Sequence, residues 1–351
     1  AQKKVMGEIS GDLAQGHPMQ RLLQGDVGSG KTIVAAFAAL QAIENGYQAA
    51  LMAPTEILTE QHYRKLCVLL EPLGVQVVWL TGSMKAKEKS EYKQIVMNGS
   101  AQLVIGTHAL FQEDVAFKKL GLVIIDEQHR FGVEQRLALR MKGASVGEPH
   151  QLMMTATPIP RTLSMSYYAD LDISVIDELP PGRTPIVTRL IADARRDDVI
   201  DRVRKACEKG AQAYWVCPLI EESEKLQLQT AMETFASIQT TFPDLKVGLV
   251  HGRLKPAEKA AVMSAFQKNE IQLLVATTVI EVGVDVPNAS LMIIDHAERM
   301  GLSQLHQLRG RVGRGAEKSS CILLYQTPLS EQARERLKVV YESTDGFIIA
   351  E

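Results

Sequence analysis

Residues 25–32 have the types and spacing of a phosphate-binding loop. They read GDVGSGKT, follow the strand-like RLLQ, and open a helical segment with apolar periodicity. Glycines let such a loop wrap so that its N–H groups point at phosphate oxygens. Lys31 is predicted to reach the β- and γ-phosphates of a nucleoside triphosphate, and the Thr32 hydroxyl to ligate Mg²⁺. The predicted nucleotide contacts are Gly25, Asp26, Val27, Gly28, Ser29, Gly30, Lys31 and Thr32.

Two adjacent carboxylates could complete the chemistry. LVIIDEQH (122–129) is an apolar strand that ends in Asp126 and Glu127. At the carboxyl edge of a parallel sheet, Asp126 can hold Mg²⁺ and Glu127 can polarise the attacking water. Consecutive strand residues point in opposite directions, so the two roles require that the strand ends here. An acidic strand cap is the alternative, and the phosphate loop upstream disfavours it.

LHQLRGRVGRG (305–315) packs three arginines between glycines. We predict a helix over 302–314 whose apolar face is formed by Leu302, Leu305, Leu308 and Val312. Gln304, Gln307, Arg311 and Arg314 then form a polar stripe, from which Arg309 is excluded. We expect Gln307, Arg311 and Arg314 to point outward together at the triphosphate, with the arginines acting as fingers across an interface. A solvated or RNA-binding arginine-rich loop is the alternative.

The elements that must position these residues alternate between strands and helices. In the first half, helical patterns at 30–44, 56–72 and 85–97 separate the strand-like runs AALMAP (49–54), VQVVWL (75–80), QLVIGT (102–107), GLVIIDE (121–127) and QLMMTAT (151–157). After DELPPGRTP (177–185) the alternation resumes with IVTRLIA, QAYWVCPLI, KVGLVHG, IQLLVATTV, LMIIDHA and SSCILLY. The fold class is α/β: two domains, each a mostly parallel sheet covered by helices on both faces, joined by a stiff proline-rich hinge.

Composition excludes some classes of protein. The 351 residues carry 39 basic and 41 acidic side chains, a net charge of −2, which excludes a globally cationic nucleic-acid binder. The four cysteines form no CxxC pair, so we expect free thiols in a reducing cytosol. No apolar run approaches the ~20 residues of a membrane span, and no signal peptide opens the sequence. We therefore expect a soluble intracellular protein.

The motifs together resemble those of superfamily 2 helicases. They are GDVGSGKT, APTEILTEQH, GTHAL, DEQH, TATPIPRT, VHGRLKPAEK, VATTVIEVGVDVPNA and QLRGRVGRG, and the resemblance covers essentially the whole chain. DELPPGRTP and DEQHRFGVEQR are most similar to the bacterial RecG family, ATP-dependent helicases that remodel branched DNA. The resemblance implies tandem RecA-like domains at 1–178 and 186–351 with a hinge at 179–185. It also implies ATP and Mg²⁺ as cofactors, and DNA forks and Holliday junctions as substrates in recombination and repair.

The same resemblance implies roles for single residues. Gln2 is expected to read adenine, and Gly283 and Asp285 to close on the nucleotide from the second domain. A relay between the ATP and DNA sites is implied for His129, Thr155 and Thr157. Loops that line the DNA strand are implied for Pro54, Thr55, Gly106, Thr107, His251, Gly252, Arg253 and Thr277. These residues follow strands, where exposed N–H groups can bind phosphates without reading bases.

Three other functions are open. The motor of a transcription-repair coupling translocase shares TATPIPRT and QLHQLRGRVGR. A nucleotide-dependent DNA clamp without unwinding is disfavoured because Lys31, Glu127, Arg311 and Arg314 are all present. An RNA unwinder is disfavoured by DEQH and TATPIPRT.

We expect the sequence to be a motor core within a longer bacterial protein. The resemblance implies an amino-terminal wedge domain that recognises junctions and a carboxyl-terminal motif that couples hydrolysis to translocation, both outside these residues. We therefore expect residual ATPase activity without measurable fork unwinding. A monomer in the cytoplasm, associated with the nucleoid and with single-stranded-DNA-binding protein in the full-length context, completes the expectation.

Overall fold

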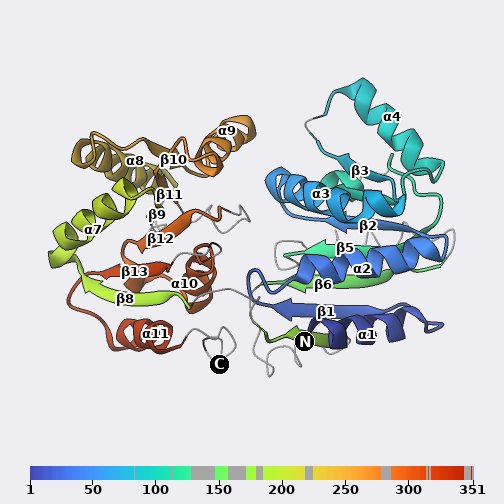
Figure 1. Ribbon diagram of the computed structural model, residues 1–351, viewed down its shortest axis with the longest axis horizontal. Helices are drawn as coiled ribbons and strands as arrows, with labels where there is room; N and C mark the ends of the chain where they lie inside the picture. The colour runs from blue at the N-terminus through green and yellow to red at the C-terminus, as the bar shows by residue number, and fades with distance from the viewer. Residues whose placement is uncertain are drawn as a thin grey trace. The chain divides into compact units, whose positions relative to one another are not determined.

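The computed structural model describes all residues except 83, 112–113, 128–146, 157–170, 179–184, 218–223, 278–285, 314, 316–317, 344–348 and 350–351. The chain divides into two compact units, Ala1–Leu179 and Pro180–Glu351, whose elements are labelled in Figure 1. The predicted hinge at 179–185 lies almost wholly outside the described residues, so it stays a prediction.

Unit 1 is a seven-stranded parallel sheet in the order β3-β4-β2-β5-β6-β1-β7. Its strands are β1 (Gln20–Gly25), β2 (Gln48–Met52), β3 (Val77–Leu80), β4 (Leu103–Gly106), β5 (Leu120–Asp126), β6 (His150–Thr155) and β7 (Asp172–Ile176). Its α-helices are α1 (Gln2–Leu13), α2 (Lys31–Glu44), α3 (Glu56–Leu70) and α4 (Ala86–Met97), with 3₁₀ turns η1 (Glu71–Leu73) and η2 (His108–Phe111).

The core of unit 1 lies on both faces of this sheet. Along β5, Leu122 and Ile124 pack into a cluster with residues of α1, α2 and α3. Val123 and Ile125 alternate with them and pack into a second cluster, which includes Val96 of α4. Because side chains alternate along a strand, a strand covered on both sides must be apolar throughout. The apolar runs in the sequence therefore report double coverage.

Unit 2 is a six-stranded parallel sheet in the order β10-β11-β9-β12-β13-β8. Its strands are β8 (Val187–Ala192), β9 (Gln212–Val216), β10 (Val247–Val250), β11 (Leu273–Ala276), β12 (Ala289–Ile294) and β13 (Ser320–Tyr325). Its α-helices are α7 (Arg196–Glu208), α8 (Glu224–Thr241), α9 (Pro256–Gln267), α10 (Leu302–Arg309) and α11 (Glu331–Glu342), with 3₁₀ turns η4 (Asp193–Arg195) and η6 (Ala297–Arg299).

The two sheets share one topology. Numbered from the first strand of each unit, both run 3-4-2-5-6-1, and unit 1 adds β7 beside its first strand. The parallel α/β class and all the strand-like runs are confirmed. Helix α1 and strand β7 were not predicted. Within β7 the burial alternates and Asp172 is exposed, so this edge strand lacks the continuous apolar run of its neighbours.

One predicted element is wrong in extent. The helix expected over 302–314 ends at Arg309, and α10 is only eight residues long. The chain then turns, with Arg311 N donating to Leu308 O and Val312 N to Arg309 O, and Gly313 takes a φ of +80°. The glycines that weaken a helix thus end it here. Among the described helices, none is long and apolar enough to cross a membrane.

Candidate nucleotide site and nucleic-acid interface

The phosphate loop connects the end of β1 to the start of α2. Gly30 caps α2 with a φ of +93°, a conformation that only glycine adopts without strain. A Cβ placed there would lie 2.1 Å from Gln2 Nε2, so a side chain would also collide with α1. The first-turn N–H groups of α2 therefore meet the loop at a helix end that favours anions.

Lys31, the first residue of α2, is held by the loop itself. Its Nζ donates to Gly25 O at 2.6 Å and to Asp26 O at 2.9 Å. Thr32 follows it in the first helical turn and is half-buried. An ammonium that rests on backbone carbonyls can exchange them for phosphate oxygens, which carry full negative charge. Both residues therefore lie where the sequence placed them, at the loop–helix junction.

Gln2 joins the amino-terminal helix to the same loop. Its Nε2 donates to Ser29 O at 2.8 Å, across 27 residues of sequence. Ser29 is buried, and among the described residues its Oγ has no hydrogen-bond partner. The predicted adenine contact and the predicted phosphate contacts therefore belong to one local structure.

Asp126 and Glu127 meet the geometric condition set by the sequence. Strand β5 ends at Asp126, and Glu127 has a φ of +51°, which turns the chain out of the strand. Glu127 N donates to Asp126 Oδ1 at 3.1 Å. A non-glycine residue with positive φ is uncommon and costs free energy. The turn gives the two carboxylates different directions, as separate metal-binding and water-polarising roles require.

His62 of α3 is a partner of this site that sequence reasoning missed. Its Nε2 lies 2.7 Å from Asp126 Oδ2, and both side chains are buried. Burial alone would raise the pKa of Asp126, but the hydrogen bond from His62 and the charges of His62 and Lys31 outweigh burial and lower the pKa. The carboxylate form is therefore favoured. Because 64 residues separate the two side chains, only the adjacency of β2 and β5 could have suggested the contact.

The groups present fit a magnesium–nucleotide complex. Asp126 supplies a buried anionic oxygen, and Lys31 lies close enough to influence the pKa of that group. Among the described residues, no group of three or more His, Cys, Asp or Glu could hold a metal by itself. Mg²⁺ is usually held by one or two protein oxygens together with substrate phosphates and water. The arrangement matches that mode.

In unit 2, the predicted arginine stripe is arranged differently. Gln307 and Arg311 are 8% and 4% exposed, so they are buried and do not form a solvent-facing stripe with a continuous helix. The early end of α10 is the reason, because Arg311 lies in a turn and is out of register with Gln307. The apolar face is confirmed, since Leu305, Leu308 and Val312 are all fully buried. Arg314 lies outside the described residues.

Arg309 has a structural environment, in agreement with its exclusion from the stripe. It is 2% exposed, and its Nη1 donates to Val340 O and Ser343 O, both at 2.7 Å. Its Nη2 lies 3.1 Å from His306 Nδ1. The guanidinium thus satisfies carbonyls at the carboxyl end of α11, where a helix leaves acceptors without intrahelical donors.

The DNA-contact candidates of unit 1 lie at one edge of its sheet. Pro54 and Thr55 follow β2 and begin α3, where Thr55 Oγ1 accepts from Leu58 N at 3.4 Å. Gly106 and Thr107 end the neighbouring β4, and Ala53 N donates to Gly106 O at 3.2 Å. Thr155 ends β6 and is buried. The sheet brings the first two loops side by side, as the sequence predicts for carboxyl ends of parallel strands.

The candidates of unit 2 form a matching pair of loops. His251, Gly252 and Arg253 follow β10, and Thr277 follows β11 with its N–H donating to Val250 O at 3.1 Å. Lys259 Nζ donates to Gly252 O at 3.0 Å. Burial, and then the charges of Lys259 and Arg253, lower the pKa of His251. The cationic surroundings suit a phosphate group. Gly283, Asp285, His129 and Thr157 lie outside the described residues.

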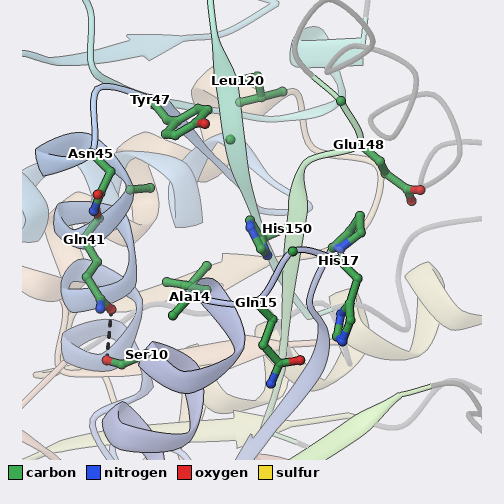
Figure 2. A pocket seen from close by; sticks show the side chains of 16 residues that line it. Ser10, Ala14, Gln15, His17, Gln41, Asn45, Tyr47, Leu120, Glu148 and His150 are labelled. Carbon is green, nitrogen blue, oxygen red and sulfur yellow. Dashed lines mark hydrogen bonds between the residues drawn. The ribbon is translucent and has the colours of Figure 1, made fainter.

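A cavity of about 500 Å³ lies apart from this chemistry (Figure 2). It is lined by the carboxyl ends of α1 and α2 and by the starts of β5 and β6, including Tyr47, Leu120 and His150. Ser10 and Gln41 join the two helices across it by a 3.0 Å hydrogen bond. The phosphate loop follows the other end of β1, so this cavity is not the nucleotide site.

Comparison with known proteins identifies the family. Models of the DEAD/DEAH box helicases and of the helicase conserved C-terminal domain match residues 1–166 and 196–316. The ATP-dependent DNA helicase RecG of Escherichia coli O157:H7 is 63% identical over 353 residues, which cover all of this chain and 51% of that protein. The chain belongs to the RecG family of superfamily 2 helicases. RecG of Aquifex aeolicus is 51% identical, and 44% of it is covered. The RecG-type chain thus spans about half the length of these curated relatives.

Solved structures agree with this assignment. A structure of RecG bound to a three-way DNA junction has a TM-score of 0.85 and 46% identity, over 99% of this chain and 45% of that one. Yeast Dbp5 bound to RNA and ADP BeF3 has a TM-score of 0.72 at 16% identity, over 96% of this chain and 87% of that one, which shows the fold alone. The expected pair of RecA-like domains is confirmed.

Proposed function

We propose that this chain is the ATP-driven motor of a DNA helicase that remodels branched DNA. The observation that carries the proposal is the joint arrangement of Lys31, Asp126 and Glu127 at one sheet edge, in a chain 63% identical to RecG. Lys31 and the loop N–H groups would bind the phosphates, Asp126 and Thr32 would hold Mg²⁺, and Glu127 would orient water. When bound, Mg²⁺ would neutralise charge on the phosphates.

The second domain would complete the reaction on closure. Arg311 and Arg314 are proposed as the fingers that stabilise charge on the transferring phosphoryl group, with Gln307, Gly283 and Asp285 beside them. Pro54, Thr55, Gly106, Thr107, His251, Gly252, Arg253 and Thr277 are proposed to contact the DNA backbone. Hydrolysis would then be tied to movement along DNA because both loop sets lie on domains that ATP closes.

The substrate and setting follow from the relatives. The name of the structure with 46% identity includes a three-way DNA junction, which supports forks and junctions as the substrate of the whole protein. We propose that it acts as a monomer in recombination and repair, in the bacterial cytoplasm at the nucleoid, with single-stranded-DNA-binding protein as a possible partner to test.

The deciding experiment compares ATPase rates with no nucleic acid, duplex DNA, a three-way DNA junction and RNA. We expect stimulation by both DNAs and little by RNA. Glu127→Gln is the control, because the amide keeps the shape and loses the base. It should bind ATP normally while hydrolysis falls by about 10²–10⁴-fold. Equal stimulation by RNA, or hydrolysis by Glu127→Gln at the parent rate, would overturn the proposal.

A further inference from the structure

The contact between His62 and Asp126 is more than an ordinary core hydrogen bond. Asp126 is 8% exposed, and both of its oxygens are engaged, Oδ1 by Glu127 N and Oδ2 by His62 Nε2. An ionised carboxylate only accepts hydrogen bonds, so the proton of this pair lies on His62 Nε2. Two donors from different elements fix the plane of the carboxylate. A metal ligand held in this way keeps its geometry before the metal arrives.

The element that carries His62 begins at a proposed DNA loop. Helix α3 begins immediately after Pro54 and Thr55, and His62 lies seven residues beyond Thr55. At a rise of about 1.5 Å per residue, the two positions are roughly 10 Å apart along the helix axis. One end of α3 therefore lies at the edge proposed for DNA, and its second turn contacts the proposed metal ligand.

Helix α3 is also anchored independently of Asp126. Thr59 Oγ1 accepts from Trp79 Nε1 at 2.9 Å and donates to Glu56 O at 2.8 Å. Tyr63 stacks on the Trp79 ring at a centroid distance of 6.0 Å. These contacts bind the helix to β3 on the far side of β4. The helix is thus a stiff element, and a shift at Thr55 would reach His62 without being absorbed by bending.

We propose that His62 is a positioning residue that holds Asp126 in its metal-binding orientation and links that orientation to the Pro54–Thr55 loop. The proposal rests on the proposed function, in which Asp126 holds Mg²⁺ and the loop contacts DNA. It assigns to α3 a role between the two sites, for which the sequence suggested only His129, Thr155 and Thr157.

The test measures metal binding directly. A fluorescent ADP analogue is bound to the chain, and Mg²⁺ is titrated to find the concentration that gives half of its effect on nucleotide affinity. We expect His62→Ala to raise this concentration by about 10–100-fold, the usual loss when a supporting partner of a metal ligand is removed. Nucleotide affinity without Mg²⁺ should stay within about threefold of the parent, since the phosphate loop is intact.

Two further variants separate positioning from loss of structure. His62→Gln places an amide donor near the position of Nε2 and should recover most of the Mg²⁺ dependence. Thr59→Val removes the bond to Trp79 on the same helix, one turn away, and should leave the Mg²⁺ midpoint unchanged. A folded His62→Ala with the parent's midpoint, or a His62→Gln no better than His62→Ala, would overturn the proposal.

The link to DNA has its own readout. Duplex DNA should lower the Mg²⁺ midpoint of the parent and of Thr59→Val, because linked sites affect each other reciprocally. The same addition should have no effect on His62→Ala. An equal shift in His62→Ala would overturn the link. A parent that binds no nucleotide, with or without Mg²⁺, would instead refute the proposed function, so the two failures are distinguishable.

Discussion

The two units have the same strand order but treat the same positions differently. In unit 1 the helix after the first strand begins with Lys31, and the fifth strand ends in Asp126. In unit 2 the helix after the first strand begins with Arg196, and the fifth strand is followed by Asp295. Each unit thus pairs a cation at a helix start with a carboxylate at the same edge of its sheet.

The difference lies in how far each pair is already committed. Arg196 Nη2 binds Asp295 Oδ1 at 2.7 Å, and Trp215 Nε1 donates to Asp295 Oδ2 at 2.7 Å. Lys31 instead rests on backbone carbonyls, and Asp126 is bound by His62 and Glu127 N. Unit 2 closes its cation and carboxylate on each other, while unit 1 keeps them apart. The same topology therefore gives a structural ion pair in one unit and a candidate nucleotide site in the other.

The largest expected effect concerns the cation of unit 1. Lys31→Ala should reduce ATP turnover by about 10³-fold or more, because it removes the side-chain cation that the loop directs to the β- and γ-phosphates. The thermal stability should change little, since the lysine is bonded only to carbonyls of its own loop. The measurement is steady-state ATPase with saturating DNA, together with a melting curve. Turnover near the parent rate would remove the basis of the comparison.

Sequence reasoning succeeded where a residue's role is set by local structure. The phosphate loop, the apolar strands and the end of β5 at Asp126 all depend on short-range patterns, and each lies where it was expected. It failed where the outcome depends on distant partners. The stripe of Gln307 and Arg311 assumed a continuous helix, but bonds from Arg309 to Val340 and Ser343 belong to another element. No spacing rule in residues 302–314 contains that information.

The arginines of 305–315 provide the second prediction. Arg311→Ala should leave nucleotide affinity within a few-fold and reduce kcat by about 10³, as loss of a finger does. Arg309→Ala should keep kcat in the folded protein and lower the free energy of unfolding by about 3 kcal/mol, because it strands two helix-end carbonyls. Single-turnover kinetics and urea unfolding separate the two effects. Equal kcat losses at both positions would favour a diffuse basic patch.

The third prediction concerns the ion pair of unit 2. Arg196→Ala should lower the free energy of unfolding by about 1–3 kcal/mol, because it leaves Asp295, which is 4% exposed, with one donor fewer. The DNA-stimulated ATPase rate of the folded protein should stay within about twofold of the parent. Arg195→Ala is the matched control, since that neighbour pairs only with Asp198 at the surface and should have almost no effect. A large ATPase loss in a stable Arg196→Ala would mean that the pair acts in catalysis.

The smallest effect lies in the salt dependence of DNA binding, where the units differ again. The unit 1 loops offer backbone N–H groups and the Thr55 and Thr107 hydroxyls, whereas the unit 2 loop offers Arg253 with Lys259 beside it. Only cationic contacts release counterions, each adding about 0.9 to the slope of log K against log salt for duplex DNA. Arg253→Ala should therefore lower the slope by about 1 and weaken binding on every sequence alike.

Thr55→Ala gives the matching measurement in unit 1. It should weaken binding slightly and leave the slope unchanged, because a hydroxyl displaces no counterion. Fluorescence anisotropy of labelled duplex DNA over a series of salt concentrations measures both quantities. Arg64→Ala serves as the control, since that exposed side chain of α3 pairs with Glu60 and lies two turns from Thr55. If Arg253→Ala kept the parent slope while Thr55→Ala lowered it, the assignment of neutral contacts to unit 1 and cationic contacts to unit 2 would be reversed.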